Sequence, residues 1–216
     1  MENGRVYWSN WAGLSDVASS MQVQRGLGAA MIGLPSIGGT VNIVTKSTDI
    51  EKGGNVMMAT GNDGYTKYGF KLSTGLLEND WAATVSLSRT TGEQFVDATT
   101  IDAYSYFLNV AKKIGENHEL SFTAFGAPQR HGQRQNRLLI DDFRRSDRGI
   151  RTNTDYGYKN GQLVNIEDNF YHKPQMSLNH YWTINDISSL TTAVYYSFGT
   201  GGGGGTAGTN KFGKYD

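Results

Sequence analysis

The chain has 216 residues with 20 basic and 20 acidic side chains, so its formal charge is balanced and no overall field favours nucleic acid or a strongly acidic partner. It contains no cysteine, which excludes a disulfide framework and a thiolate metal site. No stretch approaches the roughly 18 consecutive apolar residues of a membrane helix, which excludes a helical membrane protein but not a barrel of alternating strands.

The character of the chain changes near residue 50. Up to Lys46 the sequence is rich in glycine and has two short apolar runs, Met21–Val23 and Val41–Val44. From Gly54 onward it reads as successive strands in which apolar and polar residues alternate. With 28 Gly and only 3 Pro, the composition suits long strands joined by tight turns. We therefore expect two parts, residues 1–50 and residues 51–216.

One glycine-rich stretch, Gly33–Thr40, has the glycine spacing and the terminal Thr of a phosphate-binding loop. Gly39 stands where that loop needs the lysine that reaches the phosphates, and a β-branched strand follows in place of a long helix. A nucleotide site is therefore not expected.

Alternation of apolar and polar side chains predicts about seven strands. In the second of them, Tyr68, Phe70 and Leu72 share one face, while Lys67 and Lys71 share the other. The expected strands cover residues 55–61, 66–76, 81–91, 102–114, 118–127, 175–182 and 190–198. At about 3.3 Å per residue and a tilt near 45°, ten residues cross roughly 23 Å, close to the apolar band of an outer-membrane barrel. Soluble sandwiches usually have shorter strands, so strand length favours the membrane.

The connections between these strands alternate in length. Tight turns at residues 77–80, 115–117 and 185–187 follow the second, fourth and sixth strands. Longer, irregular connections cover residues 62–65, 92–101 and 128–170, and a Gly-rich run begins at Gly199. This alternation is typical of the periplasmic turns and extracellular loops of a bacterial barrel. It predicts that residues 46–54 lie on the periplasmic side and that the long loop lies outside.

Aromatic residues mark both ends of the expected strands. Those predicted at the long-loop ends are Tyr68, Tyr104, Tyr106, Tyr196 and Phe198, and those beside the tight turns are Trp81 and Trp182. Amphipathic rings prefer the headgroup level of a membrane, so this distribution favours two interfacial girdles over a chance enrichment of aromatics in strands.

The long loop is rich in arginine. A bidentate contact with an anionic ligand, or with lipopolysaccharide, is one interpretation of Arg130, Arg134, Arg137, Arg144, Arg145 and Arg148, which Arg151 follows. The alternative, which we favour, is an external loop whose arginines pair with its own acidic residues, Asp141, Asp142, Asp147 and Asp155.

No arrangement of residues indicates catalysis. The four histidines, His118, His131, His172 and His180, lack a carboxylate cluster with metal-ligand spacing, so we expect them to be solvated or to line the lumen. No Ser, His and Asp constellation stands out. We therefore expect neither an enzyme nor a metal or cofactor site.

The segment Met21–Lys46 resembles the final part of the plug domain of TonB-dependent outer-membrane receptors, of the kind found in Bacteroidota. That pattern has a short strand and Arg/Lys-Gly, then a run of small residues, then spaced glycines and a strand reading Val-Asn-Ile-x-Thr-Lys. The residues that carry the resemblance are Arg25, Gly26, Gly28, Gly33, Gly38, Gly39, Asn42, Thr45 and Lys46. Leu27 replaces the usual Pro and Ile32 the usual aromatic residue.

This resemblance implies an all-β fold in which the end of a plug, residues 1–50, precedes the first strands of a transmembrane antiparallel β-barrel, residues 51–216. It implies an outer-membrane location in a Gram-negative bacterium and energy-coupled uptake of a scarce ligand. The implied partners are outer-membrane lipid and the TonB–ExbB–ExbD complex, which acts through an N-terminal segment that we expect to be missing here; a surface lipoprotein is a further candidate. Siderophores, cobalamin, glycans and peptides all remain open as cargo.

About seven strands cannot close such a barrel, and no signal peptide precedes them. We therefore expect the chain to be a fragment of a longer protein. Two other functions remain as alternatives. A soluble or surface-attached all-β ligand-binding module, such as an adhesin, would have more even connections. A passive porin-like barrel would fit the strands but would leave the segment from Arg25 to Lys46 unexplained.

Overall fold

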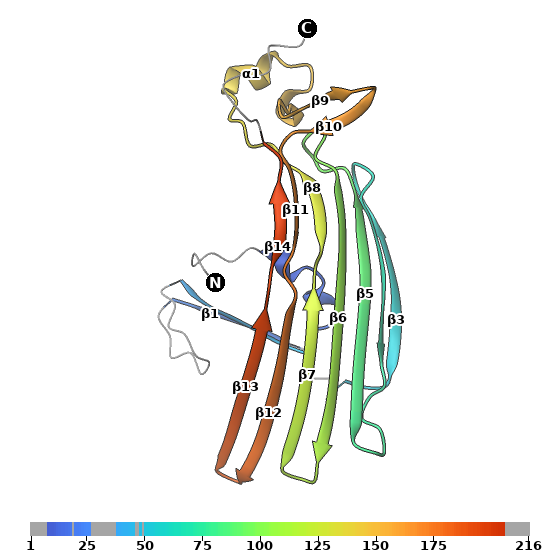
Figure 1. Ribbon diagram of the computed structural model, residues 1–216, viewed down its shortest axis with the longest axis vertical. Coiled ribbons are helices and arrows are strands. Elements are labelled where there is room, and N and C mark those ends of the chain that lie inside the picture. The colour runs from blue at the N-terminus through green and yellow to red at the C-terminus, as the bar shows by residue number, and fades with distance from the viewer. Residues whose placement is uncertain (1–7, 19, 27–37, 46–47, 49, 206–216) are drawn as a thin grey trace.

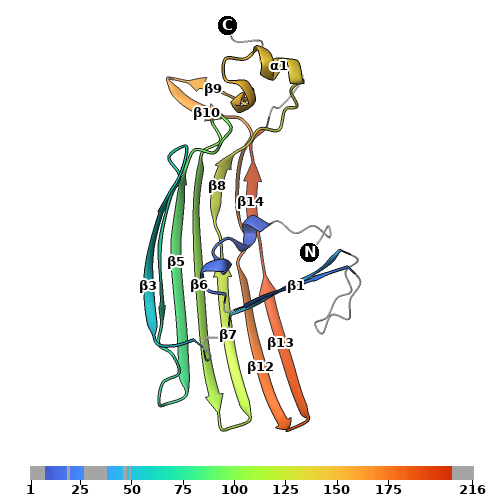
Figure 2. The ribbon, with the colours of Figure 1, turned by 180° about the vertical axis from the view of Figure 1, so that it is seen from behind.

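The computed structural model describes residues 8–18, 20–26, 38–45, 48 and 50–205. A tall antiparallel wall of strands makes up most of it (Figure 1). A short N-terminal segment crosses one face of this wall, as Figure 2 shows from behind. We call the face against the N-terminal segment the inner face and the opposite one the outer face. Within the described residues no helix is long and apolar enough to cross a membrane.

The N-terminal segment begins with two short 3-10 helices, η1 (Trp8–Trp11) and η2 (Leu14–Asp16). An antiparallel pair follows, β1 (Ser20–Arg25) and β2 (Gly39–Val44), in which Arg25 faces Gly39 and Ser20 faces Val44. Gly39 has a φ of 115°, and a Cβ there would lie 2.1 Å from the carbonyl oxygen of Gln24. The close pairing of β1 and β2 at this end therefore requires glycine.

The strand order of the wall is β13-β12-β7-β6-β5-β4-β3, so each strand except β12 follows its neighbour in the chain directly. Its members are β3 (Gly53–Thr60), β4 (Thr66–Ser73), β5 (Trp81–Gly92), β6 (Ile101–Ile114), β7 (His118–Gly126), β12 (Gln175–Asn185) and β13 (Ser188–Ser197). These strands match the seven predicted ones. The all-β antiparallel fold is confirmed, and the wall does not close into a barrel within the described residues.

Three of these strands continue past an interruption. The short strands that extend the wall are β8 (Gln129–Gly132), β11 (Asp168–His172) and β14 (Thr200–Gly203). Pro128 separates β7 from β8, and Pro174 separates β11 from β12. Proline has no N–H to donate to a ladder, which accounts for these two breaks.

The tight turns before β5, β7 and β13 lie at one end of the wall, and the longer connections lie at the other (Figure 1). The predicted alternation of connection lengths is wrong at its first cycle, because residues 61–65 between β3 and β4 also form a tight turn. Asp63 and Gly64 adopt positive φ angles of 56° and 69°, and Gly61 N–H bonds the carbonyl of Tyr65 at 2.9 Å. The left-handed backbone at these two residues reverses the chain within a short connection.

The long connection, residues 133–167, has a structure that the sequence reading missed. It contains α1 (Ile140–Arg145), the 3-10 helix η4 (Gly149–Arg151) and a hairpin of β9 (Tyr156–Lys159) and β10 (Gln162–Asn165). Asn160 and Gly161, with φ of 53° and 76°, join the hairpin. The Asn-Gly pair is a strong hairpin signal and could have revealed it.

The wall is polar inside and apolar outside. Val56 and Met58 on β3 are 86% and 76% exposed on the outer face. The pairings connect this face into rows, one of which runs Gly54, Leu72, Val85, Leu108, Ala124, Met176 and Tyr196. The inner face instead carries small or polar side chains that are buried, among them Ala82, Thr84, Ser86, Ser88 and Asn109. A protein folded for water alone would show the opposite arrangement.

Candidate functional site

The inner face meets the N-terminal segment along a seam with an apolar centre. Leu14, which begins η2, and Val17, which follows it, bury their side chains against Phe107 of β6, which is 4% exposed. Trp11 packs on Phe125 of β7 with ring centroids 5.5 Å apart. Because Phe107 and Phe125 are register partners, they form one apolar step on an otherwise polar face. This step fixes where residues 8–17 lie on the wall.

A glycine allows the closest approach in the seam. Gly13 has a φ of 84°, and a Cβ on it would lie 2.2 Å from Oγ of Ser105. Ser105 in turn shares a hydrogen bond of 2.6 Å with Ser88. The seam therefore needs a residue without a side chain on one side and a small hydroxyl on the other.

Polar contacts hold the seam above and below its apolar centre. Lys67 Nζ donates to both carboxylate oxygens of Asp16, at 2.8 and 3.1 Å, and the two side chains are only 20% and 14% exposed. Gln129 Nε2 donates to the backbone carbonyl of Ser9 at 3.1 Å. Near the tight turns, the hydroxyl of Thr48 lies 3.3 Å from both oxygens of Glu119. Removal of either partner of the Lys67–Asp16 pair would leave a largely buried charge without its counter-charge, so either substitution is expected to weaken the seam.

At the opposite end, charged side chains tie three connections together. Arg148 forms a two-point contact with Asp97, at 2.7 and 2.6 Å, and Arg151 bridges Asp63 at 2.7 Å and Asp97 at 3.4 Å. The guanidinium of Arg148, ahead of that of Arg151, lowers the pKa of the Asp97 carboxyl below its usual range. Asn153 also donates to the carbonyl of Asp97 at 2.8 Å. The long connection is thus fastened to the β3–β4 and β5–β6 connections.

Most of the arginines proposed to contact an anionic ligand have partners within the chain. Arg134 donates to the carbonyls of Ile150 and Thr152, Arg145 pairs with Asp141, and Arg148 with Asp97. Arg130 lies in β8, outside the loop, where it pairs with Asp168 at 2.9 Å and stacks on Phe170. Within the described residues Arg137 and Arg144 form no ion pair. A ligand contact stays a prediction.

The residues of the plug motif lie partly in the β1–β2 pair. Arg25 and Gly39 face each other, and Nδ2 of Asn42 donates to Oε1 of Gln22 at 3.4 Å. Gly26, with a φ of 73°, follows β1, Gly38 precedes β2, and Thr45 follows it. Gly28, Gly33 and Lys46 lie outside the described residues. The motif's role in a plug stays a prediction.

Of the seven predicted interface aromatics, six belong to the outer face by register, and Phe198 follows β13 directly. Tyr68 and Tyr104 flank Arg89 at the long-loop end, while Trp81 and Trp182 lie beside the tight turns. Tyr106 shares a hydrogen bond of 3.0 Å with His172, and Tyr196 lies 5.8 Å from Phe198. The register row of Tyr196 contains Leu108, which lies two residues after Tyr106 on β6. Tyr196 therefore lies two positions nearer the tight-turn end of the wall than Tyr106 does. Their role as membrane girdles stays a prediction.

The histidines are expected from the sequence to be solvated or to line the lumen, and the lumen is the wrong location for two of them. His118 pairs with Trp182 and His180 pairs with Leu120, so the register places both histidines on the outer, apolar face and not on the lumen side. The even spacing of His118 from Leu120 along β7 is the signal that could have shown this. His131, by contrast, faces Ile101 and lies on the inner face. Within the described residues no three His, Asp or Glu side chains gather as a metal site would need.

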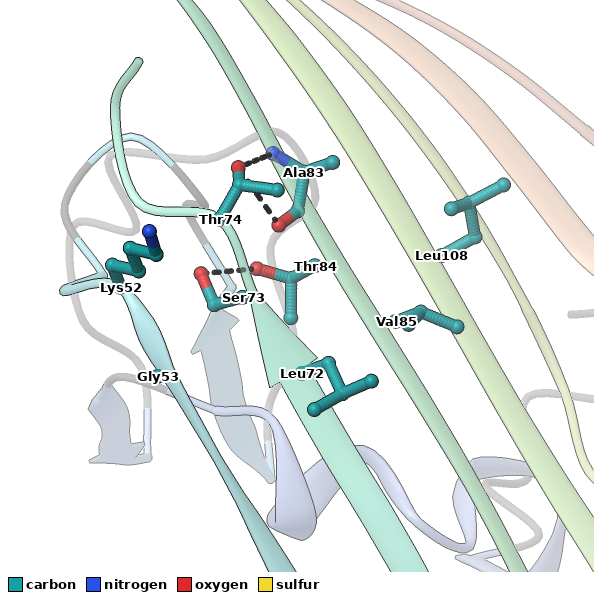
Figure 3. Close-up of a pocket in the computed structure, with 9 residues that line it drawn as sticks. All are labelled: Lys52, Gly53, Leu72, Ser73, Thr74, Ala83, Thr84, Val85 and Leu108. Carbon is teal, nitrogen blue, oxygen red and sulfur yellow. Dashed lines mark hydrogen bonds between the residues drawn. The ribbon is translucent and has the colours of Figure 1, made fainter.

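A pocket of about 460 Å³ is lined by residues at the start of β3 and the end of β4 and by residues of β5 and β6 (Figure 3). Its lining is Lys52, Gly53, Leu72, Ser73, Thr74, Ala83, Thr84, Val85 and Leu108. The hydroxyls of Ser73 and Thr84 bond each other, and that of Thr74 bonds the backbone of Ala83, as the dashed lines show. These polar atoms are therefore occupied and give little means of orienting a polar ligand.

Comparisons with known proteins support the fold. No family model matches the chain, and no curated protein does. The siderophore receptor PiuA from Acinetobacter baumannii aligns with a TM-score of 0.65 and 13% identity, over 86% of this chain and 26% of that one. The ferric-catecholate import receptor Fiu from E. coli K12, in an open form, gives a TM-score of 0.65 and 12% identity, over 84% and 28%. The chain thus spans about a quarter of either structure, and the likeness is one of fold.

Proposed function

We propose that the chain is part of a TonB-dependent outer-membrane receptor that captures a scarce ligand outside the cell and admits it through a gated barrel. The observation that carries this proposal is the polarity of the wall. Its apolar side chains are exposed on the outer face, whereas its small and polar side chains face the N-terminal segment. Apolar exposure is costly in water and stabilising against hydrocarbon, so a bilayer is the solvent that fits this face.

The height of the apolar face supports the same proposal. On β5 it runs from Trp81, beside the tight turn, to Arg89. Eight steps of about 3.3 Å make roughly 26 Å along the strand and about 20 Å across a bilayer when tilted, close to the apolar band of such barrels. Charged side chains lie at both ends of this apolar stretch. Arg89 pairs with Asp102 at one end, and the ammonium of Lys112 lies 5.5 Å from the ring of Trp81 at the other.

In this proposal residues 1–50 are the end of a plug and residues 51–216 the first strands around it. The seam between Leu14, Val17 and Phe107 holds the plug against the wall. Energy coupling comes from the TonB–ExbB–ExbD complex, and outer-membrane lipid covers the outer face; a surface lipoprotein is a further candidate partner. Arg137 and Arg144 are the loop arginines best placed to contact an anionic ligand.

The proposed orientation can be tested in intact cells with the full-length protein. The chain has no native cysteine, so any cysteine of the full-length protein lies outside these 216 residues. With those cysteines replaced first, a single introduced cysteine is a unique label site. A membrane-impermeant maleimide should label Arg144→Cys, in α1, in intact cells. It should label Glu116→Cys, in the turn between β6 and β7, only after the outer membrane is opened. Equal labelling of both positions in intact cells would contradict the proposal.

Conductance separates the proposed receptor from a passive porin. The full-length protein in a planar bilayer should stay closed, because the seam keeps the N-terminal segment across the inner face. Deletion of residues 1–50 should produce open channels. A steady open conductance of the undeleted protein would favour the porin, and a soluble monomer that needs no detergent would favour the all-β binding module.

A further inference from the structure

Two histidines on the outer face point their rings directly at each other. Nδ1 of His118 lies 3.0 Å from Nε2 of His180. The ring planes are within 7° of parallel, and the ring centroids are 5.2 Å apart. The centroid separation is close to the nitrogen–nitrogen distance plus the two distances from ring centre to nitrogen, which is the largest value that this hydrogen bond allows. The two rings therefore lie nearly in one plane, edge to edge, and are not stacked face to face. One ring donates its N–H and the other accepts it.

The sheet holds this pair in place. His118 begins β7 and pairs with Trp182, while His180 lies two residues earlier on β12 and pairs with Leu120. The ring of Trp182 packs 5.4 Å from that of His118. Lys112 is the titratable side chain in the register row of His180, on the far side of Leu120. Both histidines are half-buried. His118 directly follows the tight turn between β6 and β7, and Lys112 in the row of His180 marks the limit of the apolar face, so an ion in water can reach the pair.

The spacing of the two nitrogens is already that of a chelate. Imidazole nitrogens bind zinc at about 2.0–2.1 Å, so two such ligands at roughly a right angle around the ion lie about 3 Å apart. Binding requires each lone pair to turn by about 45° from the line between the two nitrogens toward the ion, so both side chains must rotate when the ion binds. The donor ring must also carry its proton on its other nitrogen, which is the ordinary alternative tautomer.

We propose that His118 and His180 form a two-histidine chelate for a divalent transition-metal ion, with water in the remaining coordination positions. The ordinary order of stability predicts that Cu²⁺ binds more tightly than Ni²⁺ or Zn²⁺. The site depends on the register of β7 and β12 and not on the proposed transport function. It lies at the tight-turn end of the wall, away from the seam and from the arginine-rich loop.

Tryptophan fluorescence gives a direct test, because Trp182 lies against His118 and bound Cu²⁺ quenches nearby indole emission. The full chain in detergent should bind one equivalent of Cu²⁺ with quenching. His118→Asn and His180→Asn should each weaken the apparent affinity by about tenfold to 10²-fold, since each removes one arm of the chelate. His131→Asn, on the inner face, is the matched control and should titrate as the unaltered chain does.

A second measurement keeps the test decisive if a variant folds poorly. The electron paramagnetic resonance spectrum of the unaltered protein with one equivalent of Cu²⁺ should show coupling to two imidazole nitrogens. Trp182→Phe should remove most of the quenching and leave that spectrum unchanged. A spectrum with one imidazole or none, or equal titrations of the His118, His180 and His131 variants, would overturn the proposal.

Discussion

Phe107→Ala is expected to loosen the N-terminal segment from the wall. Phe107 is 4% exposed and forms one buried cluster with Leu14 and Val17. Truncation of a buried phenylalanine costs about 3–5 kcal/mol. Since about 1.4 kcal/mol is a factor of ten in an equilibrium constant, a loss of about 3 kcal/mol should raise the population of the separated state roughly 10²-fold. The lost contacts belong to the seam, so the effect should concentrate there.

Hydrogen exchange of the full-length protein in detergent measures this opening. The amides of Val17 and Ala18 both donate to the carbonyl of Leu14, at 3.2 and 2.9 Å, so a peptide covering residues 8–18 reports on the seam. Phe107→Ala should accelerate its exchange by about 10²-fold. Phe122→Ala is the control of equal size. Phe122 is 38% exposed on the outer face, and its truncation should leave this peptide unchanged. Equal acceleration in both variants would refute the assignment of the two faces.

Two further predictions concern the seam and the loop cluster. Gly13→Ala should accelerate hydrogen exchange in the same peptide, because the new side chain is strained at a φ of 84° and clashes with Ser105. Gly149→Ala is the control, since Gly149 has a φ of 54° and open space around it. It adds backbone strain without a clash and should leave exchange in the seam peptide unchanged. Because Arg148 lowers the pKa of Asp97 in the folded protein, the loop contact is complete above the unfolded carboxyl pKa of about 3.9 and is lost as pH falls through the lower folded value. Proteolysis of the loop should therefore rise on acidification, and Asp97→Asn should be cleaved readily at neutral pH too; a loop equally resistant in both proteins at neutral pH would contradict this.

The strands of the wall could be predicted because each carries its signal locally. Period-two alternation runs from Trp81 to Ser88 in β5 and through most of β6, and the Gly-Glu-Asn turn between β6 and β7 marks the boundary of both strands. The elements of the long connection were harder to predict from the sequence. α1 is six residues long, too short for helical periodicity to register, and its position depends on contacts with distant connections.

The seam could not be predicted because its partners lie far apart in the sequence. Leu14 and Val17 carry no periodic pattern, and their contact with Phe107 spans about ninety positions. One signal was present. Phe107 and Phe125 are large apolar residues on the face of their strands that otherwise carries small and polar ones. An apolar residue out of phase on a polar face indicates that something covers it.

The polarity of the wall is tested most directly by two neighbouring residues of β5. Ser86 is 4% exposed on the inner face, and Leu87 is 44% exposed on the outer face. A spin label on Leu87→Cys, in the full-length protein in lipid bilayers, should be reached by dissolved oxygen and shielded from a water-soluble nickel complex. The same label on Ser86→Cys should be far less accessible to oxygen. If label 87 were reached by the nickel complex and shielded from oxygen, the outer face would be in water and the proposed membrane wall would be wrong.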